Sequence, residues 1–217
     1  MTNLFHLRRR TLASLLKEAR LDCLLVTSPA NWYYLTGFTG ESGILVISQR
    51  GASLVTDGRF TVQSKEETSG VRVVLQKGSL LESVGVLLKG SAARRVGFDP
   101  GQLTVAQFRT LRRASGPRPR WIPAAGKVEG LRMRKDAAEL LQMRKAAILA
   151  GEVVQAAIRL LKPGIREFEV AAEIEYQMRK RGASGPAFET IVAFGERAAL
   201  PHARPTAKRL RKMSWWC

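Results

Sequence analysis

Residues 21–38 read LDCLLVTSPANWYYLTGF, and this stretch decides the predicted fold. Residues 21–26 are predicted to form a buried strand, because residues 23–26, CLLV, are a continuous apolar run. Cys23 lies within the run, so we interpret it as a packing residue and not as a reactive thiol. Ser28 and Pro29 follow immediately and end the strand, because proline cannot donate a backbone hydrogen bond to a neighbour.

Helical and extended patterns alternate on both sides of this strand. Before it, residues 8–19 carry leucines at helical spacing between charged residues, which indicates an amphipathic helix. After it we expect strands over 43–48, 52–56, 71–75, 95–98 and 121–122, and helices over 60–68, 79–89 and 104–113. Alternating strands and helices predict an α/β domain built on one mixed sheet.

The first predicted domain ends after a run of residues that break regular structure. Residues 115–120 read SGPRPR, and two prolines and a glycine end the preceding helix. A short strand around 121–122 then closes the domain. We therefore place the boundary near residue 125, with one domain over 1–125 and a second over 126–217.

The second segment opens with a long helix. Asp136 can cap it, and Glu139 stands three residues later, close to a capping box. The helix carries one apolar seam and ends at residues 162–164, KPG. A second helix is predicted over 167–181 and a strand over 188–194. The seam consists of Leu140, Met143, Ala147, Ala150, Val154, Ala157 and Leu161.

The composition limits the cellular compartments and the classes of protein that fit this chain. The 217 residues include two cysteines, Cys23 and Cys217, without a CxxC pair that would indicate zinc or redox chemistry. We see no secretory signal, and no apolar run approaches the about 18 residues of a membrane span. We expect a cytoplasmic protein without a membrane partner.

The formal net charge of +18 has two interpretations. It could reflect binding to nucleic acid. It could also arise because an acidic C-terminal half is missing from the sequence. The basic residues are spread over the whole chain and no nucleic-acid motif accompanies them, so we favour the second interpretation and do not expect nucleic acid as a partner.

Three stretches together resemble the Xaa-Pro aminopeptidase and Xaa-Pro dipeptidase family, which shares its fold with creatinase. Residues 21–38 look like the opening of its N-terminal domain. Residues 131–147 and 161–164 are similar to the start of its pita-bread catalytic domain. Residues 185–193, GPAFETIVA, and 200–206, LPHARPT, are similar to the strand and loop that carry the family's substrate-side histidine. The resemblance implies a creatinase/prolidase-type mixed-sheet domain followed by an incomplete α+β pita-bread domain.

The resemblance also implies an activity. Family members hydrolyse the N-terminal Xaa-Pro bond of proline-containing peptides, and two divalent metal ions, often manganese, activate a water between them. The N-terminal domain aids oligomerisation, so a homo-oligomer is expected. The ligands of the family are two aspartates, a histidine and two glutamates, all beyond the Leu-Pro-His loop. We therefore expect no metal site in this chain and no activity as written.

The last residues after Lys212 depart from the family pattern, since they read MSWWC over 213–217. Met and Trp each have one codon. Read one frame over, with AAG for Lys212 and AGC for Ser214, the codons give Asp-Glu-Leu-Val-Val, which looks like the family's missing strand. We hypothesise a frameshift, and nucleotide sequence past the stop codon without the ligand aspartates would contradict it.

Two further functions stay open beside the peptidase. A non-catalytic basic binding module for protein or nucleic acid would account for the charge. A non-functional fragment would expose the seam of the long helix and aggregate or be proteolysed beyond about residue 125.

Two site residues follow from the resemblance. His202 would donate a hydrogen bond to the substrate carbonyl or the developing oxyanion. Without the resemblance it would be an exposed loop histidine. Phe188 would border the substrate pocket, or it would be a strand core residue.

The remaining candidates have structural explanations that we favour. Asp57 can accept hydrogen bonds in a turn, or it can face a neighbouring subunit. Residues 31–34, NWYY, could line an entrance but more often pack a domain. We assign Glu167, Glu169, Glu173 and Glu175 to a solvated helix face.

Overall fold

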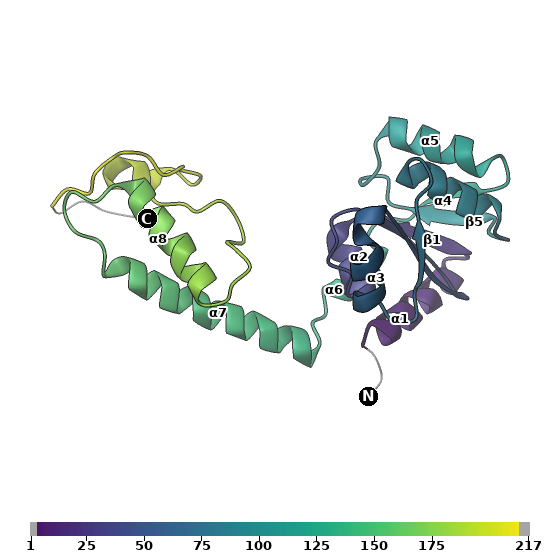
Figure 1. The fold of residues 1–217 in the computed structure, drawn as a ribbon, viewed down its shortest axis with the longest axis horizontal. Coiled ribbons are helices and arrows are strands. Elements are labelled where there is room, and N and C mark those ends of the chain that lie inside the picture. The colour runs from purple at the N-terminus through teal and green to yellow at the C-terminus, as the bar shows by residue number, and fades with distance from the viewer. Residues whose placement is uncertain (1–3, 213–217) are drawn as a thin grey trace. The chain divides into compact units, whose positions relative to one another are not determined.

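The computed structural model describes residues 4–212 and divides the chain into two compact units, Met1–Arg134 and Lys135–Cys217 (Figure 1). We expected the boundary near residue 125. It falls later because residues 127–132 form helix α6 (Lys127–Arg132), which packs against α1 (Leu4–Glu18) in the first unit. The tail over 213–217, with the hypothesised frameshift and Cys217, lies outside the described residues.

The first unit is built on a six-stranded mixed sheet in the order β4-β3-β2-β1-β5-β6. β1 pairs antiparallel with β2 and parallel with β5, while β3 pairs parallel with β4 and β5 with β6. β2 and β3 form the predicted hairpin. The mixed α/β architecture expected from the sequence is therefore confirmed. The strands are β1 (Cys23–Val26), β2 (Gly43–Ser48), β3 (Gly51–Thr56), β4 (Arg72–Leu75), β5 (Arg95–Phe98) and β6 (Arg120–Pro123).

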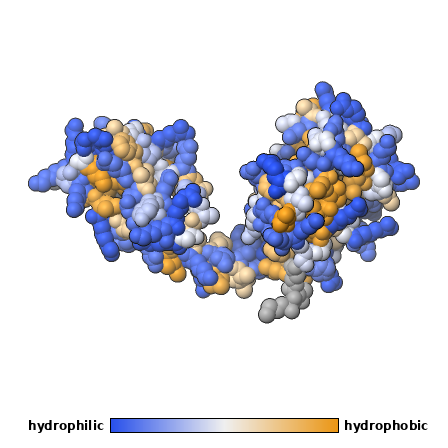
Figure 2. All heavy atoms as spheres, viewed as in Figure 1, coloured by the Kyte–Doolittle hydropathy of each residue, from blue (hydrophilic) through white to orange (hydrophobic). Residues whose placement is uncertain are grey.

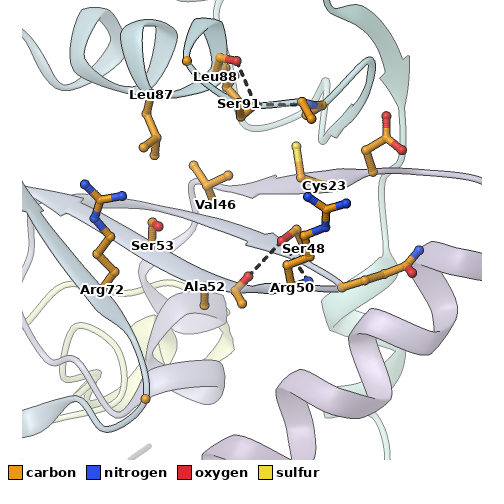
Figure 3. Close-up of a pocket in the computed structure, with 17 residues that line it drawn as sticks. Cys23, Val46, Ser48, Arg50, Ala52, Ser53, Arg72, Leu87, Leu88 and Ser91 are labelled. Atoms are coloured by element: carbon orange, nitrogen blue, oxygen red, sulfur yellow. Dashed lines mark hydrogen bonds between the residues drawn. The ribbon is translucent and has the colours of Figure 1, made fainter.

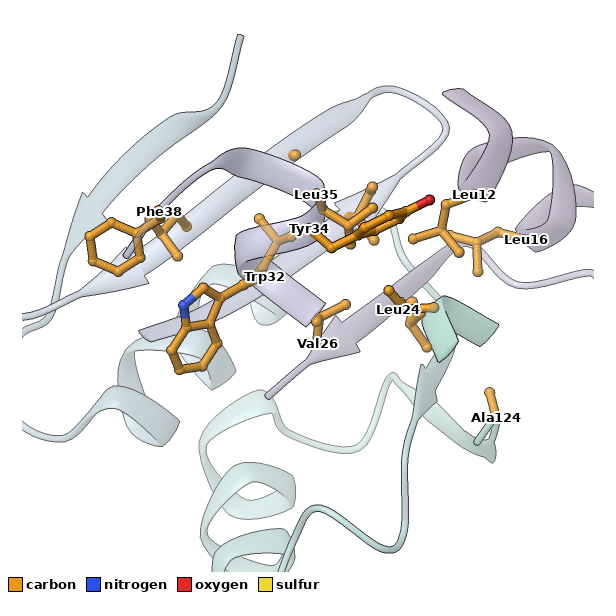
Figure 4. Close-up of a cluster of buried hydrophobic side chains, with 14 of the residues drawn as sticks. Leu12, Leu16, Leu24, Val26, Trp32, Tyr34, Leu35, Phe38 and Ala124 are labelled. Atoms are coloured by element: carbon orange, nitrogen blue, oxygen red, sulfur yellow. The ribbon is translucent and has the colours of Figure 1, made fainter. Parts of the chain in front are cut away.

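Each face of this sheet has its own hydrophobic core, because successive side chains of a strand point to opposite faces. Leu24 and Val26 of β1 pack in one cluster with Leu12 and Leu16 of α1 (Figure 4). Cys23 and Leu25 of the same strand belong to a second cluster. That cluster includes buried residues of α4 (Leu80–Lys89) and α5 (Val105–Ser115), so helices cover both faces.

One short helix differs from the prediction made from the sequence. Residues that we interpreted as a break after β1 form α2 (Pro29–Thr36). Proline suits the first turn of a helix because its missing N–H has no intrahelical partner there. Gly37 ends the helix with a φ of 84°, and its N–H donates to the carbonyl of Tyr33. The predicted helix α3 (Thr61–Glu67) follows a short 3₁₀ turn, Gly58–Phe60.

The second unit contains two of the predicted elements but lacks the predicted strand. Its helices are α7 (Ala137–Ile158) and α8 (Glu167–Lys180), followed by a 3₁₀ turn over Gly195–Ala199. The segment 188–194 is not a strand. Val192 and Phe194 are buried with Val170 of α8, so this segment packs on a helix instead of entering a sheet.

The predicted seam of α7 is largely exposed. Its buried residues are Val153 and Ala157, whereas Leu140 is 47% and Met143 55% exposed. Val153 was not part of the seam. Apolar side chains are visible at the surface of both units in Figure 2. Despite its length, α7 is not apolar enough to cross a membrane, and neither is any other helix among residues 4–212.

Candidate functional site

The two site residues predicted from the resemblance lie on one pocket. It has a volume of about 410 Å³ and lies between the segments 188–191 and 201–204. Phe188 is 72% exposed, and His202 is also exposed. These two side chains stand on separate loops, and the fold brings the loops together at one pocket. The lining residues are Phe188, Glu189, Thr190, Ile191, Pro201, His202, Ala203 and Arg204.

Charged and buried residues connect the two loops. Arg204 forms an ion pair with Glu189 at 3.2 Å, and both side chains are exposed, so the pair contributes little to stability. Ala203, next to His202, is buried and holds that loop against the unit. Thr190 donates a hydrogen bond to Glu175 of α8, at 2.7 Å, and so attaches the loop of Phe188 to α8.

A buried carboxylate organises the segment that carries His202. Glu167, the first residue of α8, is fully buried. Its Oε1 accepts hydrogen bonds from the backbone N–H of Phe194, at 2.9 Å, and from Nε of Arg197, at 3.2 Å. Its Oε2 accepts from the backbone N–H and the hydroxyl of Thr206, at 2.8 and 2.5 Å. Glu167 thus holds both ends of the loop.

The electrostatics of Glu167 follow from these contacts. Burial alone would raise its pKa, but the hydrogen bonds from Thr206 and Phe194 outweigh burial and lower the pKa. The carboxylate is therefore ionised at neutral pH, and four donors stabilise its charge.

The assignment of Glu167 to a solvated face was wrong. The sequence did contain a signal, since Glu167, Val170, Ala171 and Ile174 follow the spacing i, i+3, i+4, i+7 of one helix face. A glutamate in an apolar stripe requires buried donors. Those donors lie 27 to 39 residues away, so no local pattern revealed them. The other three glutamates are not fully buried.

The favoured explanations of the other candidates agree with the structure. Asp57 accepts a hydrogen bond from the backbone N–H of Arg59 and forms an ion pair with its side chain at 2.9 Å. The bond from the Arg59 side chain lowers the pKa of Asp57 to about 2. Asn31 is buried, donates to Glu129 at 2.6 Å and accepts from Arg132 at 2.8 Å, so it joins α2 to α6.

The described residues do not fit a metal centre. Over residues 4–212 no group of three or more His, Cys, Asp or Glu side chains could hold a metal ion. The chemistry available in the pocket is a histidine that can donate or accept a proton, the positive charge of Arg204 and the apolar ring of Phe188. The pocket can therefore bind and orient a small polar substrate beside an apolar group.

Comparisons with known proteins agree with both units. Residues 8–134 match the model of the creatinase/prolidase N-terminal domain, and residues 141–215 match metallopeptidase family M24. The chain is 34% identical over 191 residues to the uncharacterized peptidase YqhT of Bacillus subtilis, covering 88% of this chain and 54% of that protein. It is 29% identical over 205 residues to an Xaa-Pro dipeptidase of Pyrococcus furiosus, covering 94% of this chain and 57% of the relative.

Solved structures give the same result. The Xaa-Pro dipeptidase from Bacillus anthracis is similar with a TM-score of 0.90 and 30% identity, over 98% of this chain and 59% of that one. The X-Pro aminopeptidase from Thermotoga maritima has a TM-score of 0.84 and 29% identity, over 95% of this chain and 58% of that one. The chain thus spans little more than half the length of these relatives. It belongs to the family that joins a creatinase/prolidase N-terminal domain to a metallopeptidase family M24 domain, the family of the Xaa-Pro dipeptidases and aminopeptidases.

Proposed function

We propose that the pocket of His202 and Phe188 is the substrate side of an Xaa-Pro peptidase, which hydrolyses the N-terminal Xaa-Pro bond of a peptide. The observation that carries the proposal is that both residues line one pocket although they stand on separate loops. The buried carboxylate of Glu167 supports it, because it fixes both ends of the segment that carries His202. Related proteins are named for action on Xaa-Pro substrates.

The proposed roles follow from the chemistry of the two side chains. His202 donates a hydrogen bond to the substrate carbonyl and stabilises the negative charge that develops on its oxygen. Phe188 offers an exposed apolar ring against which a proline ring can pack. Phe188 thus serves to bind the substrate, whereas His202 both orients it and stabilises the charge of the transition state.

None of the described residues is proposed as a metal ligand. In the intact family two divalent metal ions, which we expect to be manganese, would supply the activation of the attacking water when bound. Residues 4–212 offer no group that fits them. We therefore expect the purified 217-residue chain to show no hydrolysis of an Xaa-Pro peptide in the presence of manganese. Hydrolysis that copurifies with the chain and is lost in the variant His202→Asn would contradict the expected lack of activity.

Substrate binding can be tested without turnover, because the chain contains only two histidines, His6 and His202. With histidine-selective isotope labelling, each gives its own NMR signals, which the variants His6→Asn and His202→Asn assign. Titration with the dipeptide Ala-Pro is expected to shift the His202 signals and to leave those of His6 in place. His6 therefore serves as an internal control.

A second variant tests the apolar side of the pocket. Phe188→Ala is expected to weaken Ala-Pro binding by about tenfold, since it removes an aromatic contact from an exposed position without disturbing the core. Ala-Ala, which lacks the proline ring, should bind wild type and Phe188→Ala about equally. The proposal is wrong if Ala-Pro leaves both histidine signals unchanged or moves them equally.

A further inference from the structure

A second cavity lies in the first unit, at one end of its sheet. β1, β5 and β6 begin at this end, β2 finishes there, and β3 and β4 begin there, as the registers Cys23↔Ser48, Ser48↔Gly51 and Arg95↔Arg120 show. Asp57, which follows the last residue of β3, lies at the opposite end. We call this region the arginine end, because seven arginines stand at or just beside these strand ends: Arg20, Arg50, Arg72, Arg94, Arg95, Arg118 and Arg120.

The cavity at the arginine end has a volume of about 770 Å³, within the usual size range of small-molecule sites. It lies between the sheet and the C-terminal end of α4 with the loop that follows. In Figure 3, Arg72 stands on one side of the cavity and Arg50 on the other, with Ser53 and Val46 between them. Leu87 of α4 faces them from above.

Within the described part of the chain, the two arginines of the cavity have no acidic partner. Among residues 4–212, neither Arg50 nor Arg72 forms a salt bridge. The one carboxylate in the lining is Asp22. Its Oδ2 accepts hydrogen bonds from the backbone N–H groups of Arg94, at 2.7 Å, and Arg95, at 2.8 Å. The carboxylate of Asp22 is therefore hydrogen-bonded to the backbone, and it does not neutralise the guanidinium groups of Arg50 and Arg72. Their positive charge can interact with a ligand.

The floor of the cavity is apolar. Val46, Leu88 and Cys23 are each at most 9% exposed and line it together with Leu87. Burial raises the pKa of the Cys23 thiol to about 12, so this side chain is neutral and acts as part of the apolar wall. Hydroxyl groups of Ser48 and Ser53 lie on the sheet side of the same cavity.

We propose that this cavity binds small organic anions that combine a carboxylate or phosphate group with an apolar part. Arg50 and Arg72 hold the anionic group, since guanidinium groups suit planar carboxylates and phosphates. Val46 and Leu87 contact the apolar part. The lining contains no aromatic side chain, and single-stranded nucleic acids bind through aromatic platforms, so the cavity fits a small molecule better than a nucleic acid.

Calorimetric titration of the 217-residue chain with 1-naphthoate tests the proposal. Arg50→Gln and Arg72→Gln are each expected to weaken binding by about tenfold, because each removes a charge-assisted hydrogen bond. Arg144→Gln makes the same charge change on an exposed position of the second unit and should leave the affinity unchanged. Both cavity arginines are exposed, so the variants should fold, and circular dichroism checks this.

Three further ligands separate the contributions. Inorganic phosphate carries charge only and 1-naphthol the ring only, and each should bind at least about tenfold more weakly than 1-naphthoate. Phosphate that binds as tightly as 1-naphthoate would show that the apolar floor takes no part in binding.

Two other results would also contradict the proposal. Equal losses of 1-naphthoate affinity in all three arginine variants would show unspecific charge attraction. If a thymidine oligonucleotide binds more tightly than 1-naphthoate, with a steep dependence on salt, and Arg50→Gln and Arg72→Gln abolish this binding, the arginine end is a nucleic-acid surface. Each of these results overturns the proposal.

Discussion

At the scale of single residues, Glu167 shows how one side chain fixes the geometry of the candidate site. A buried charge is tolerated only when hydrogen bonds replace its lost hydration. Glu167 has four such bonds, and they all go to the segment between Phe194 and Thr206. The position of His202 within that segment therefore depends on a residue that precedes it by more than thirty positions.

We expect Glu167→Gln to destabilise the second unit by about 2–3 kcal/mol, because a neutral amide leaves charged and backbone donors poorly satisfied. Thermal or urea unfolding measures the loss. Glu169→Gln is the matched control on the same helix. Glu169 accepts from the backbone N–H of Arg166, and glutamine can keep this capping contact, so the change should be small. Equal effects of the two variants would show that Glu167 does not hold the loop.

The same residue predicts an acid-sensitive stability. Its pKa is lowered in the folded state, so the carboxylate stabilises the fold at pH values above its unfolded pKa of about 4.5. This contribution is lost as the pH falls from that value through the lower folded pKa. In Glu167→Gln this part of the pH dependence should be absent. A wild type and a variant with parallel stability curves between pH 6 and pH 3 would contradict the prediction.

At the scale of elements, the contact between α4 and α5 depends on one glycine. A Cβ atom at Gly85 would lie 2.4 Å from Cβ of Ala114 and 2.9 Å from the backbone N of Ser115. Such distances force the two helices apart. The close approach allows α4 and α5 to bury Leu88 and Leu111 in one cluster over the sheet.

We therefore expect Gly85→Ala to destabilise the first unit by about 1–3 kcal/mol, the usual cost of overpacking a core. The matched control is Gly151→Ala in α7, where no atom lies within 4 Å of the added Cβ. There alanine should stabilise the helix by about 0.5–1 kcal/mol, because glycine loses more backbone freedom on folding. Chemical unfolding should show changes of opposite sign in the free energy of unfolding of the two variants. An unchanged stability of Gly85→Ala would refute the close helix contact.

At the scale of the whole molecule, the two units differ in how completely their apolar side chains are covered. The first has two core clusters, one on each face of a six-stranded sheet. Among its described residues the second has one cluster, and α7 leaves Leu141 and Ile148 more than half exposed. Stability is therefore expected to differ between the units.

Limited trypsin digestion should reveal this difference. Arg134 and Lys135 are exposed at the division between the units, outside any helix. We expect the first cut there, a persistent fragment ending near Arg134, and faster loss of the second unit. Mass spectrometry of the time course identifies the fragments. A chain that is cut first within residues 4–126, or that is lost as one piece, would contradict the expectation.

The sequence by itself determined the local features of this protein. The alternating elements of the first unit, its mixed α/β class, the hairpin of β2 and β3 and the long helix α7 were predicted correctly, because periodicity and breaking residues act over a few positions. The family was also correct, since its motifs are local strings in a fixed order.

Only the tertiary structure decided which side chains are buried and which meet. It replaced the predicted strand over 188–194 with a segment packed on α8, buried Val153 in place of Leu140, and extended the first unit to Arg134. It also surrounded Glu167 with donors and placed Arg50 beside the same cavity as Arg72. The physical reason is that burial and hydrogen-bond partners depend on residues far apart in the chain, which no local pattern records.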